Sequence, residues 1–545
     1  MIFLSTLLLS LFITITLIPV FRRLAIRVHA LDFPNERKVH TSPVPKSGGL
    51  AMAVGTLIPV VLWPQGNELI RSIIVGAGIV VVFGILDDFK DLGYKAKFSG
   101  QVIAALVVIL YGGIKIQCLG MLLPDDACIP NWLAIPLTLV VIVGVTNAVN
   151  LSDGLDGLAG GISMLSFALI GYLAYRSGNI PIAVLSFAMV GAIFGFLRFN
   201  TYPANVFMGD AGSQLLGFAA ISLSLGLTQG GGALSPLLPL ILLGFPVLDT
   251  LTVMLERLAQ GRSPFVADKN HFHHKLLRLG LFHTEAVVLI YVVQAFLVIS
   301  AFALRFYSEW LLLGLYMVFS GVILTGFFVA EKTGWRFKRY DFLDQAVKGK
   351  LKILKDRYVF IKVTFRFVAY GTPLLFLFSC LMPKEVPSYL GFASLGLVVV
   401  LLLVRLFKRS FMAHALRISL YLSIPFVVYL GEAAFIPMMT QQSIQIYNLS
   451  FGALVGFSIL TMKFTRRTKG FRTTPMDFLI LFIALVVPNL PDFAAGIEHM
   501  GMIAVKMIAF FFSYEVLIGE LRGETRKLAV GTVVALLVVG VKGVV

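Results

Sequence analysis

Two amides and two carboxylates lie close together at the end of a long apolar stretch. In TNAVNLSDGLDGLAGG (146–161) they are Asn147, Asn150, Asp153 and Asp156. Such groups are costly in a bilayer and are rare there unless they serve a site. If the segment is helical, the spacing of three residues places the last three on roughly one face. Asn, Asp and Gly are also ordinary turn residues, so a loop between two membrane helices is the alternative.

A second group of acids opens the segment LDDFKDLGYKAK (86–97). Asp87 and Asp88 are adjacent, and Asp91 follows them. Adjacent carboxylates repel one another, so this pattern is typical of a cation site or a general base. The alternative is that Lys90, Lys95 and Lys97 simply neutralise the acids.

A single acid, Asp210, stands in the turn GDAGS (209–213) just before another apolar stretch. A carboxylate at membrane depth needs a partner or a metal ion. The simpler interpretation is an N-cap for the following helix, which is compatible with metal binding.

Basic residues and histidines form two further clusters. His271, His273 and His274 lie beside Lys275, after Asp249 and Arg257. With cations next to them, the imidazoles are expected to donate hydrogen bonds to phosphate oxygens, and a transition-metal site is the alternative.

Lys38 and Lys46 precede a helix that opens with two glycines, Gly48 and Gly49. Basic side chains at a helix N-terminus suit a phosphate, whereas a positive anchor for the membrane is the simpler interpretation.

The composition shows what kind of protein positions these clusters. Of 545 residues, 58% are hydrophobic and 13% charged, and the mean hydropathy is +0.91. These values predict an all-α polytopic membrane protein. The net charge of +17 lies in short loops between apolar runs. It therefore favours an anionic lipid or a phosphate ligand and argues against nucleic acid.

Apolar runs of roughly 20 residues predict about eleven membrane helices up to residue 330 and about seven more after residue 366. The first group is expected near 2–20, 48–63, 69–86, 99–116, 132–149, 158–175, 180–197, 214–228, 236–254, 284–304 and 309–330. The second is expected near 366–382, 389–404, 412–430, 445–462, 476–490, 499–519 and 528–541. The predicted domains are residues 1–335, a basic linker or amphipathic helix at 336–365, and a membrane region of unknown role at 366–545.

The loops of one side hold about 26 Lys and Arg up to residue 366, against about 4 on the other side. The basic side is predicted to be cytoplasmic. Every polar cluster described above falls on that side. Cys118 and Cys128 fall in one loop of the other side, where they form either a disulfide or two separate thiols.

The motifs NxxNxxDGxDGLAGG, LDDxxD, GDAGS, PxxDT and HxHHxL occur in this order. They resemble the polyprenyl-phosphate N-acetylhexosamine-1-phosphate transferases, a superfamily that includes the phospho-muramoyl-pentapeptide translocase and the enzymes starting O-antigen and teichoic acid synthesis. SPFVADKNHFHHKLL (263–277) is closer to the O-antigen and teichoic acid branch. The resemblance covers roughly residues 1–330, and residues 340–545 exceed the family pattern.

The resemblance implies transfer of a HexNAc 1-phosphate, GlcNAc 1-phosphate first, from a UDP-sugar to undecaprenyl phosphate at the cytoplasmic face of a bacterial inner membrane. It implies Mg²⁺, with Mn²⁺ as an alternative, held by Asn150 and Asp210. The implied catalytic set is Asp87, Asp88, Asp210, His271, His273 and His274. The implied substrate-binding set is Lys38, Lys46, Asp91, Asn147, Asp153, Asp156, Asp249 and Arg257. Further expected partners are a second copy of the chain and downstream glycosyltransferases.

Direct attack by the lipid phosphate and a covalent phospho-aspartate are the two accounts of the chemistry. Two other classes of protein compete with the transferase. An intramembrane prenyltransferase needs a second Asp-rich repeat, for which DGLDG is a poor match, and gives the histidines no role. A transporter suits about eighteen spans, but its polar residues would gather at the bilayer midplane.

Overall fold

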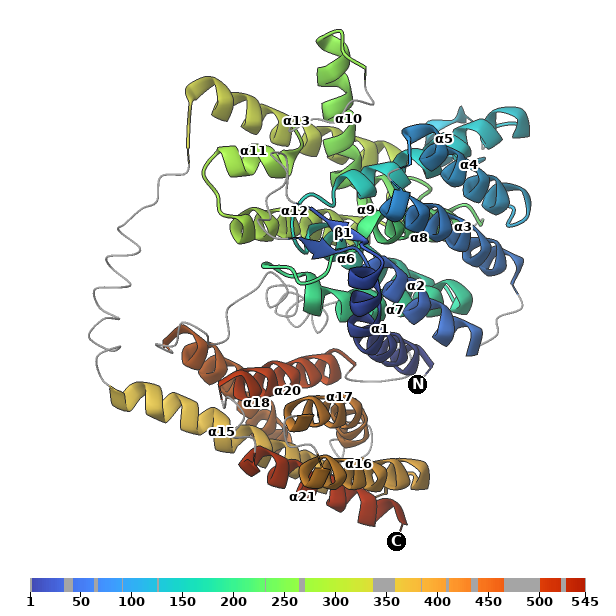
Figure 1. Cartoon of the computed structure of the whole chain (residues 1–545). Helices are drawn as coiled ribbons and strands as arrows, with labels where there is room; N and C mark the ends of the chain where they lie inside the picture. Colours follow the sequence, from blue (N-terminus) through green and yellow to red (C-terminus); the bar gives the residue numbers. More distant parts are fainter. Residues whose placement is uncertain are drawn as a thin grey trace. The chain divides into compact units, whose positions relative to one another are not determined.

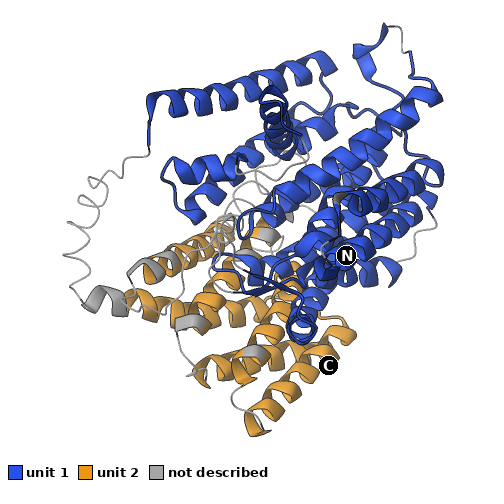
Figure 2. Cartoon of the chain, turned by 45° about the horizontal axis from the view of Figure 1, so that its top comes forward, with its two compact units in different colours: residues 1–338 blue, residues 339–545 orange. Residues whose placement is uncertain are grey.

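The computed structural model of the chain consists of two compact units, residues Met1–Lys338 and Arg339–Val545, coloured separately in Figure 2. The residues that the structure describes are 2–33, 43–62, 67–90, 92–124, 127–230, 232–263, 270–336, 358–383, 385–407, 411–432, 440–464, 500–520 and 526–544. The predicted division at 336–365 remains a prediction, because residues 337–357 lie outside these ranges.

The described secondary structure of unit 1 is mostly helical, and in one short hairpin β1 (Leu31–Asp32) pairs antiparallel with β2 (Val44–Pro45) (Figure 1). Its helices are α1 (Ile2–Arg27), α2 (Gly48–Leu62), α3 (Glu68–Lys90), α4 (Tyr94–Leu110), α5 (Asn131–Leu151), α6 (Leu158–Arg176), α7 (Ile180–Asn200), α8 (Gly209–Thr228), α9 (Leu238–Leu242), α10 (Gly244–Ala259), α11 (Phe272–Arg278), α12 (His283–Ala303) and α13 (Glu309–Thr333), with the 3₁₀ turn η1 (Gly120–Leu122).

The prediction of an all-α polytopic membrane protein is confirmed. Across the described parts of both units, eleven helices are long and apolar enough to cross a bilayer. Bilayer-spanning segments are restricted to helices and closed barrels, because lipid offers the backbone no hydrogen bonds. The predicted span at 476–490 lies outside the described residues.

Helix α8 forms the centre of unit 1 and is almost entirely buried. It packs against α2, α3, α5 and α6. Small residues permit the close approach of these helices: Gly49 lies against Gly212, Gly84 against Ala211, and Gly217 against Thr146. Close backbone packing of this kind is a main source of helix association in a membrane. This close packing fixes the position of the N-terminus of α8 relative to the ends of α2, α3 and α5.

The prediction of one continuous span at 236–254 is wrong, because the chain breaks at Leu243 between α9 and α10. Pro246 has no N–H to donate to the carbonyl of Leu242, four residues earlier. That carbonyl instead accepts hydrogen bonds from Ser166 Oγ (2.9 Å) and Gln294 Nε2 (2.8 Å). Side chains from two other helices therefore supply the hydrogen bonds that the Leu242 carbonyl lacks within its own helix.

Unit 2 contains α15 (Tyr358–Leu381), α16 (Ser388–Phe407), α17 (Met412–Leu430), α18 (Gln441–Phe464), α20 (Met500–Glu520) and α21 (Arg526–Val544). Gly391 of α16 lies directly against Gly543 of α21. Lys506 and Glu432 form a buried ion pair, with Lys506 Nζ 4.2 Å from the centre of the Tyr447 ring.

Candidate active site

The ends of three helices bring the acids of the segment 86–97 together with Asp210. Asp87 lies in the last turn of α3, Asp210 in the first turn of α8, and Lys97 near the start of α4. Lys97 Nζ lies 2.6 Å from Asp87 Oδ2 and 2.7 Å from Asp210 Oδ2. Burial alone would lower the pKa of Lys97, but the two carboxylates outweigh it and raise that pKa above its ordinary value. One ammonium group thus bridges two acids that lie 123 positions apart in the chain.

Asp88 caps α8 from outside that helix. Its carboxylate accepts hydrogen bonds from the backbone N–H groups of Asp210 (3.1 Å) and Ala211 (3.4 Å). Gly209 has φ +67°, and a side chain there would overlap the Asp88 carboxylate. The expectation that Asp210 caps this helix itself is wrong, because Asp210 lies inside the first turn and the cap comes from α3.

Lys46, in the segment between α1 and α2, joins that segment to the acids at the start of α8. Its Nζ lies 3.7 Å from Asp88 Oδ1 and 3.7 Å from Asp32 Oδ1 of β1. The backbone holds it there, since residue 46 bridges Phe207, just before α8. Of the predicted basic and acidic residues nearby, Lys38 and Asp91 lie outside the described residues.

Asn150 reaches the same end of α8 from α5. Ser213 Oγ donates a hydrogen bond of 2.5 Å to Asn150 Oδ1 and contacts Gly209 O at 3.0 Å. The structure therefore brings Asp87, Asp210 and Asn150 to one end of the bundle. Asn147, one turn earlier in α5, is half-buried.

The segment after Asn150 is a turn between two helices, which is the alternative that the sequence left open, so Asn150, Asp153 and Asp156 do not share a helical face. Helix α5 ends at Leu151 and α6 begins at Leu158. Gly157 between them has φ +82°, and its N–H donates to Asn200 Oδ1 (2.9 Å). Asp156 Oδ2 accepts a hydrogen bond from Ala204 N (2.9 Å).

Asp153 keeps partial exposure in this turn. Burial first, and then the carboxylates of Asp210, Asp156 and Asp88, raise its pKa to about 8. Asp153 is thus protonated at neutral pH until a positive charge comes near.

The histidine cluster lies against the same turn. Asp249 accepts hydrogen bonds from His271 Nδ1 (2.9 Å) and from Phe272 N (2.7 Å), so both its oxygens face protein donors. A side chain at Gly154 would overlap the His273 ring. Burial, and then His274 and His271, lower the pKa of His273 well below its ordinary value, so this ring is neutral. Because Asp249 accepts the hydrogen bond from His271 Nδ1, it positions the His271 ring.

The remaining predicted residues lie near this cluster in the chain. His274 is partly exposed beside His273, with ring centres 4.3 Å apart. Arg257 is buried near the end of α10. Next to it, Glu256 Oε1 accepts a hydrogen bond from Lys275 Nζ (2.6 Å), which ties α11 to α10.

Sequence reasoning missed the roles of Lys97 and Ser213. It treated Lys97 only as a neutralising neighbour, and it treated Ser213 as part of a turn. Lys97 lies in the segment 86–97 and Ser213 in the turn 209–213, and both segments stand out for their acids. Their place beside these acids is the signal that could have indicated their roles.

The donors at this end of α8 suit a hard divalent cation. Asp87 Oδ1 is buried and has no hydrogen-bond partner among the described residues. Those residues contain no ready-made group of three or more Asp, Glu, His or Cys side chains that could hold a metal ion. Magnesium does not need such a cage, because it commonly takes one or two carboxylates together with substrate phosphates.

Comparison with known proteins links this geometry to a family. The sequence pattern of Glycosyl transferase family 4 matches residues 70–228, which include Asp87, Asn150 and Asp210. A Bacillus subtilis (strain 168) protein named probable undecaprenyl-phosphate N-acetylglucosaminyl 1-phosphate transferase is 37% identical over 327 residues, which cover 60% of this chain and 90% of the relative.

Two other relatives extend the comparison. Undecaprenyl-phosphate alpha-N-acetylglucosaminyl 1-phosphate transferase of Escherichia coli (strain K12) is 33% identical over 346 residues, covering 62% of this chain and 93% of the relative. Decaprenyl-phosphate N-acetylglucosaminephosphotransferase of Mycolicibacterium smegmatis (strain ATCC 700084 / mc(2)155) is 38% identical over 305 residues, covering 50% and 74%.

Proposed function

The chain belongs to glycosyl transferase family 4, in the branch of the polyprenyl-phosphate N-acetylhexosamine-1-phosphate transferases. From that premise we propose that it transfers N-acetylglucosamine 1-phosphate from UDP-GlcNAc to undecaprenyl phosphate and thereby starts a cell-envelope polysaccharide. The names of the relatives support undecaprenyl phosphate as the acceptor and N-acetylglucosamine 1-phosphate as the transferred group. The observation that carries the proposal is the convergence of Asp87, Asp210 and Asn150 at one end of α8.

In the proposed reaction, an oxygen of the lipid phosphate attacks the β-phosphorus of UDP-GlcNAc. The bond from that phosphorus to the oxygen bridging it to the α-phosphate breaks, and UMP leaves. The products are undecaprenyl-diphospho-GlcNAc and UMP. The second pKa of a phosphate monoester is about 6, so the lipid phosphate is largely a nucleophile already. Positioning and charge neutralisation therefore supply most of the rate acceleration.

The two adjacent acids differ in what they can do. Both oxygens of Asp88 accept backbone N–H groups of α8, and Lys46 lies nearby, so Asp88 holds the site in place. Asp87 has one oxygen on Lys97 and a buried second oxygen with no hydrogen-bond partner in the described ranges. Asp87 is therefore the acid that we assign to the remaining lipid-phosphate proton or to a cation.

Mg²⁺, or Mn²⁺ in its place, belongs to the proposal as a cofactor. Asp87, Asp210 and Asn150 would hold it, and when bound it would neutralise phosphate charge as the phosphoryl group moves. Lys46 and Lys97 supply positive charge at the same end of the bundle. His271 and His274 are assigned to hydrogen bonds with the diphosphate or the sugar. We place this end of unit 1 at the cytoplasmic face because its loops are the basic ones.

A radiolabel assay tests the proposal. Membranes containing the full chain are incubated with undecaprenyl phosphate, Mg²⁺ and UDP-GlcNAc labelled in both the sugar and the β-phosphate. Both labels are expected in butanol-extractable lipid. Asp210→Asn and Asp87→Asn are expected to lower the rate by about 100-fold or more, in line with the loss of one group that stabilises transition-state charge.

Glu68→Gln is the matched control, because it removes one carboxylate at the opposite end of α3. It is expected to leave the rate unchanged. Label transfer from another UDP-sugar but not from UDP-GlcNAc would overturn the sugar assignment. No transfer from any UDP-sugar would overturn the assigned reaction.

A further inference from the structure

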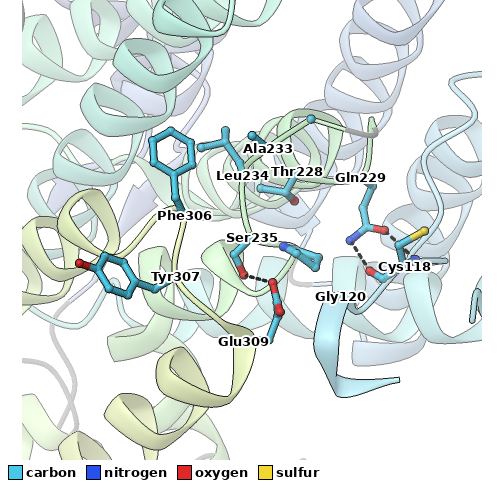
Figure 3. Close-up of a pocket in the computed structure, with 12 residues that line it drawn as sticks. Cys118, Gly120, Thr228, Gln229, Ala233, Leu234, Ser235, Phe306, Tyr307 and Glu309 are labelled. Atoms are coloured by element: carbon cyan, nitrogen blue, oxygen red, sulfur yellow. Dashed lines mark hydrogen bonds between the residues drawn. The ribbon is translucent and has the colours of Figure 1, made fainter. Parts of the chain in front are cut away.

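A pocket lies at the end of unit 1 opposite to the acids, with a volume of about 260 Å³ (Figure 3). The acids lie near the start of α4 and α8 and beside the end of α5, whereas this pocket is lined by the loop between α4 and α5 and by the loop after α8. Its lining includes Cys118, Gly120, Gln229, Ser235 and Glu309.

Two side chains hold the α4–α5 loop as one wall of this pocket. Glu309, largely buried, accepts hydrogen bonds from Met121 N (3.0 Å) and from Ser235 Oγ (2.9 Å). Gln229 accepts from Cys118 N (3.3 Å) and donates to Cys118 O (3.2 Å). The second pair is drawn as dashed lines in Figure 3.

Cys118 and Cys128 meet at the base of this loop. Both are exposed, and their Sγ atoms lie 2.9 Å apart. Beside them, Ile129 N donates a hydrogen bond of 2.7 Å to Gln117 O, so the two arms of the loop are already held together by the backbone. Two sulfur atoms in contact on paired arms can be joined with little backbone movement.

We propose that Cys118 and Cys128 form a disulfide that closes this loop and fixes the wall of the Glu309 pocket. The inference relies on the proposed orientation, which places the loop on the extracytoplasmic side, where disulfides persist. The reaction is an exchange with an external dithiol oxidant in its disulfide form. One cysteine thiolate attacks that disulfide, which forms a mixed disulfide and releases one thiol of the oxidant. The second cysteine then attacks the protein sulfur of the mixed disulfide and releases the other thiol of the oxidant. The protein thereby loses two electrons and two protons, which the oxidant takes up.

Counting thiols in the full chain tests the bond. Membranes are quenched in acid, denatured, and treated with a maleimide-polyethylene glycol reagent with or without prior reduction. Cys380 is the third cysteine. The wild type is expected to take one tag without reduction and three after it, whereas Cys118→Ser is expected to take two tags in both conditions. Three tags on unreduced wild type would overturn the proposal.

A second measurement tests the fixing of the pocket wall. Reductant is expected to lower the melting temperature of the wild type in detergent by about 5 °C, because the bond restrains the unfolded chain and the loop. It is expected to leave Cys118→Ser unchanged. Equal behaviour of the two proteins would overturn the role assigned to the bond. Label transfer to lipid is read in a separate assay, so failure of the transferase proposal and failure of this one are distinguishable.

Discussion

At the scale of single residues, two ammonium groups organise the candidate active site. Lys97 bridges Asp87 and Asp210, and Lys46 lies between Asp88 and Asp32. Pairs of opposite charge that are partly withdrawn from water interact more strongly than exposed pairs. Each of the four acids thus has a protein cation beside it before any substrate binds, although two ammonium groups offset only part of the charge of four carboxylates. A bound cation or phosphate has to displace or share these contacts.

Asp153 yields a prediction about pH. Its pKa is about 8 in the folded protein and 3.8 ordinarily. Between these two pH values, the folded state keeps a proton that the unfolded chain has released. This contribution to stability is complete below about pH 4 and is lost as the pH rises through about 8. In metal-free detergent solution, the melting temperature of the wild type is expected to fall relative to Asp153→Asn between about pH 5 and pH 8.

The reason is that Asn at position 153 has the shape of the protonated acid but does not titrate. Above about pH 9 the difference between the two proteins is expected to stop changing. Melting curves collected in parallel across this range provide the measurement. A constant difference at all pH values would contradict the raised pKa.

The acids of the site could be singled out from the sequence, whereas the contacts between them could not. Asp87, Asp210 and Asn150 stand out because polar groups are rare next to apolar spans. The bridge through Lys97 depends on how α3, α4 and α8 are placed in space, and no local spacing encodes that placement. The capping of α8 by Asp88 is a contact across 122 residues and could not be predicted for the same reason.

At the scale of secondary structure, hydropathy predicted most helices of unit 1 closely because lipid requires long apolar helices. It failed at Leu243, where the broken backbone is satisfied by Ser166 and Gln294 from other helices. Apolar content alone does not distinguish a continuous helix from two helices joined by such a break. Pro246 was the local signal.

Two glycines of α3 test the importance of helix spacing. A side chain at Gly84 would overlap the backbone of Ala211 in α8, whereas a side chain at Gly78 would meet nothing within 4 Å. Both Gly→Ala changes raise intrinsic helix propensity by about 1 kcal/mol. Gly84→Ala is nevertheless expected to push α3 away from α8, to move Asp87 away from Asp210, and to lower transferase activity by about 10-fold or more.

Gly78→Ala is the matched control on the same helix and is expected to retain full activity. Rates of lipid labelling and protein levels in the membrane are measured for both variants. Full activity of Gly84→Ala would mean that the spacing of α3 and α8 does not position the acids.

At the scale of the whole molecule, the chain joins two units with different distributions of charge. In unit 1 the carboxylates of the candidate active site gather at helix ends. In unit 2, Lys506 and Glu432 instead form a pair that is buried within the helices, beside the ring of Tyr447. A second pair joins Arg417 Nε to Glu515 Oε1 at 2.8 Å. Ionisable groups inside a membrane unit are retained only when they are paired or functional.

The buried pair of unit 2 can be tested by removing one charge and then both. Glu432→Gln leaves Lys506 without its counter-charge and is expected to destabilise the protein by about 3–5 kcal/mol, because a lone buried charge is poorly solvated. Combining it with Lys506→Met removes both charges and is expected to restore most of that loss. Glu385→Gln, at an exposed position, serves as the control. Melting temperatures in detergent provide the measurement, with lipid labelling expected to persist wherever the protein remains folded. If the double variant is no more stable than Glu432→Gln, the pair does not act through charge compensation.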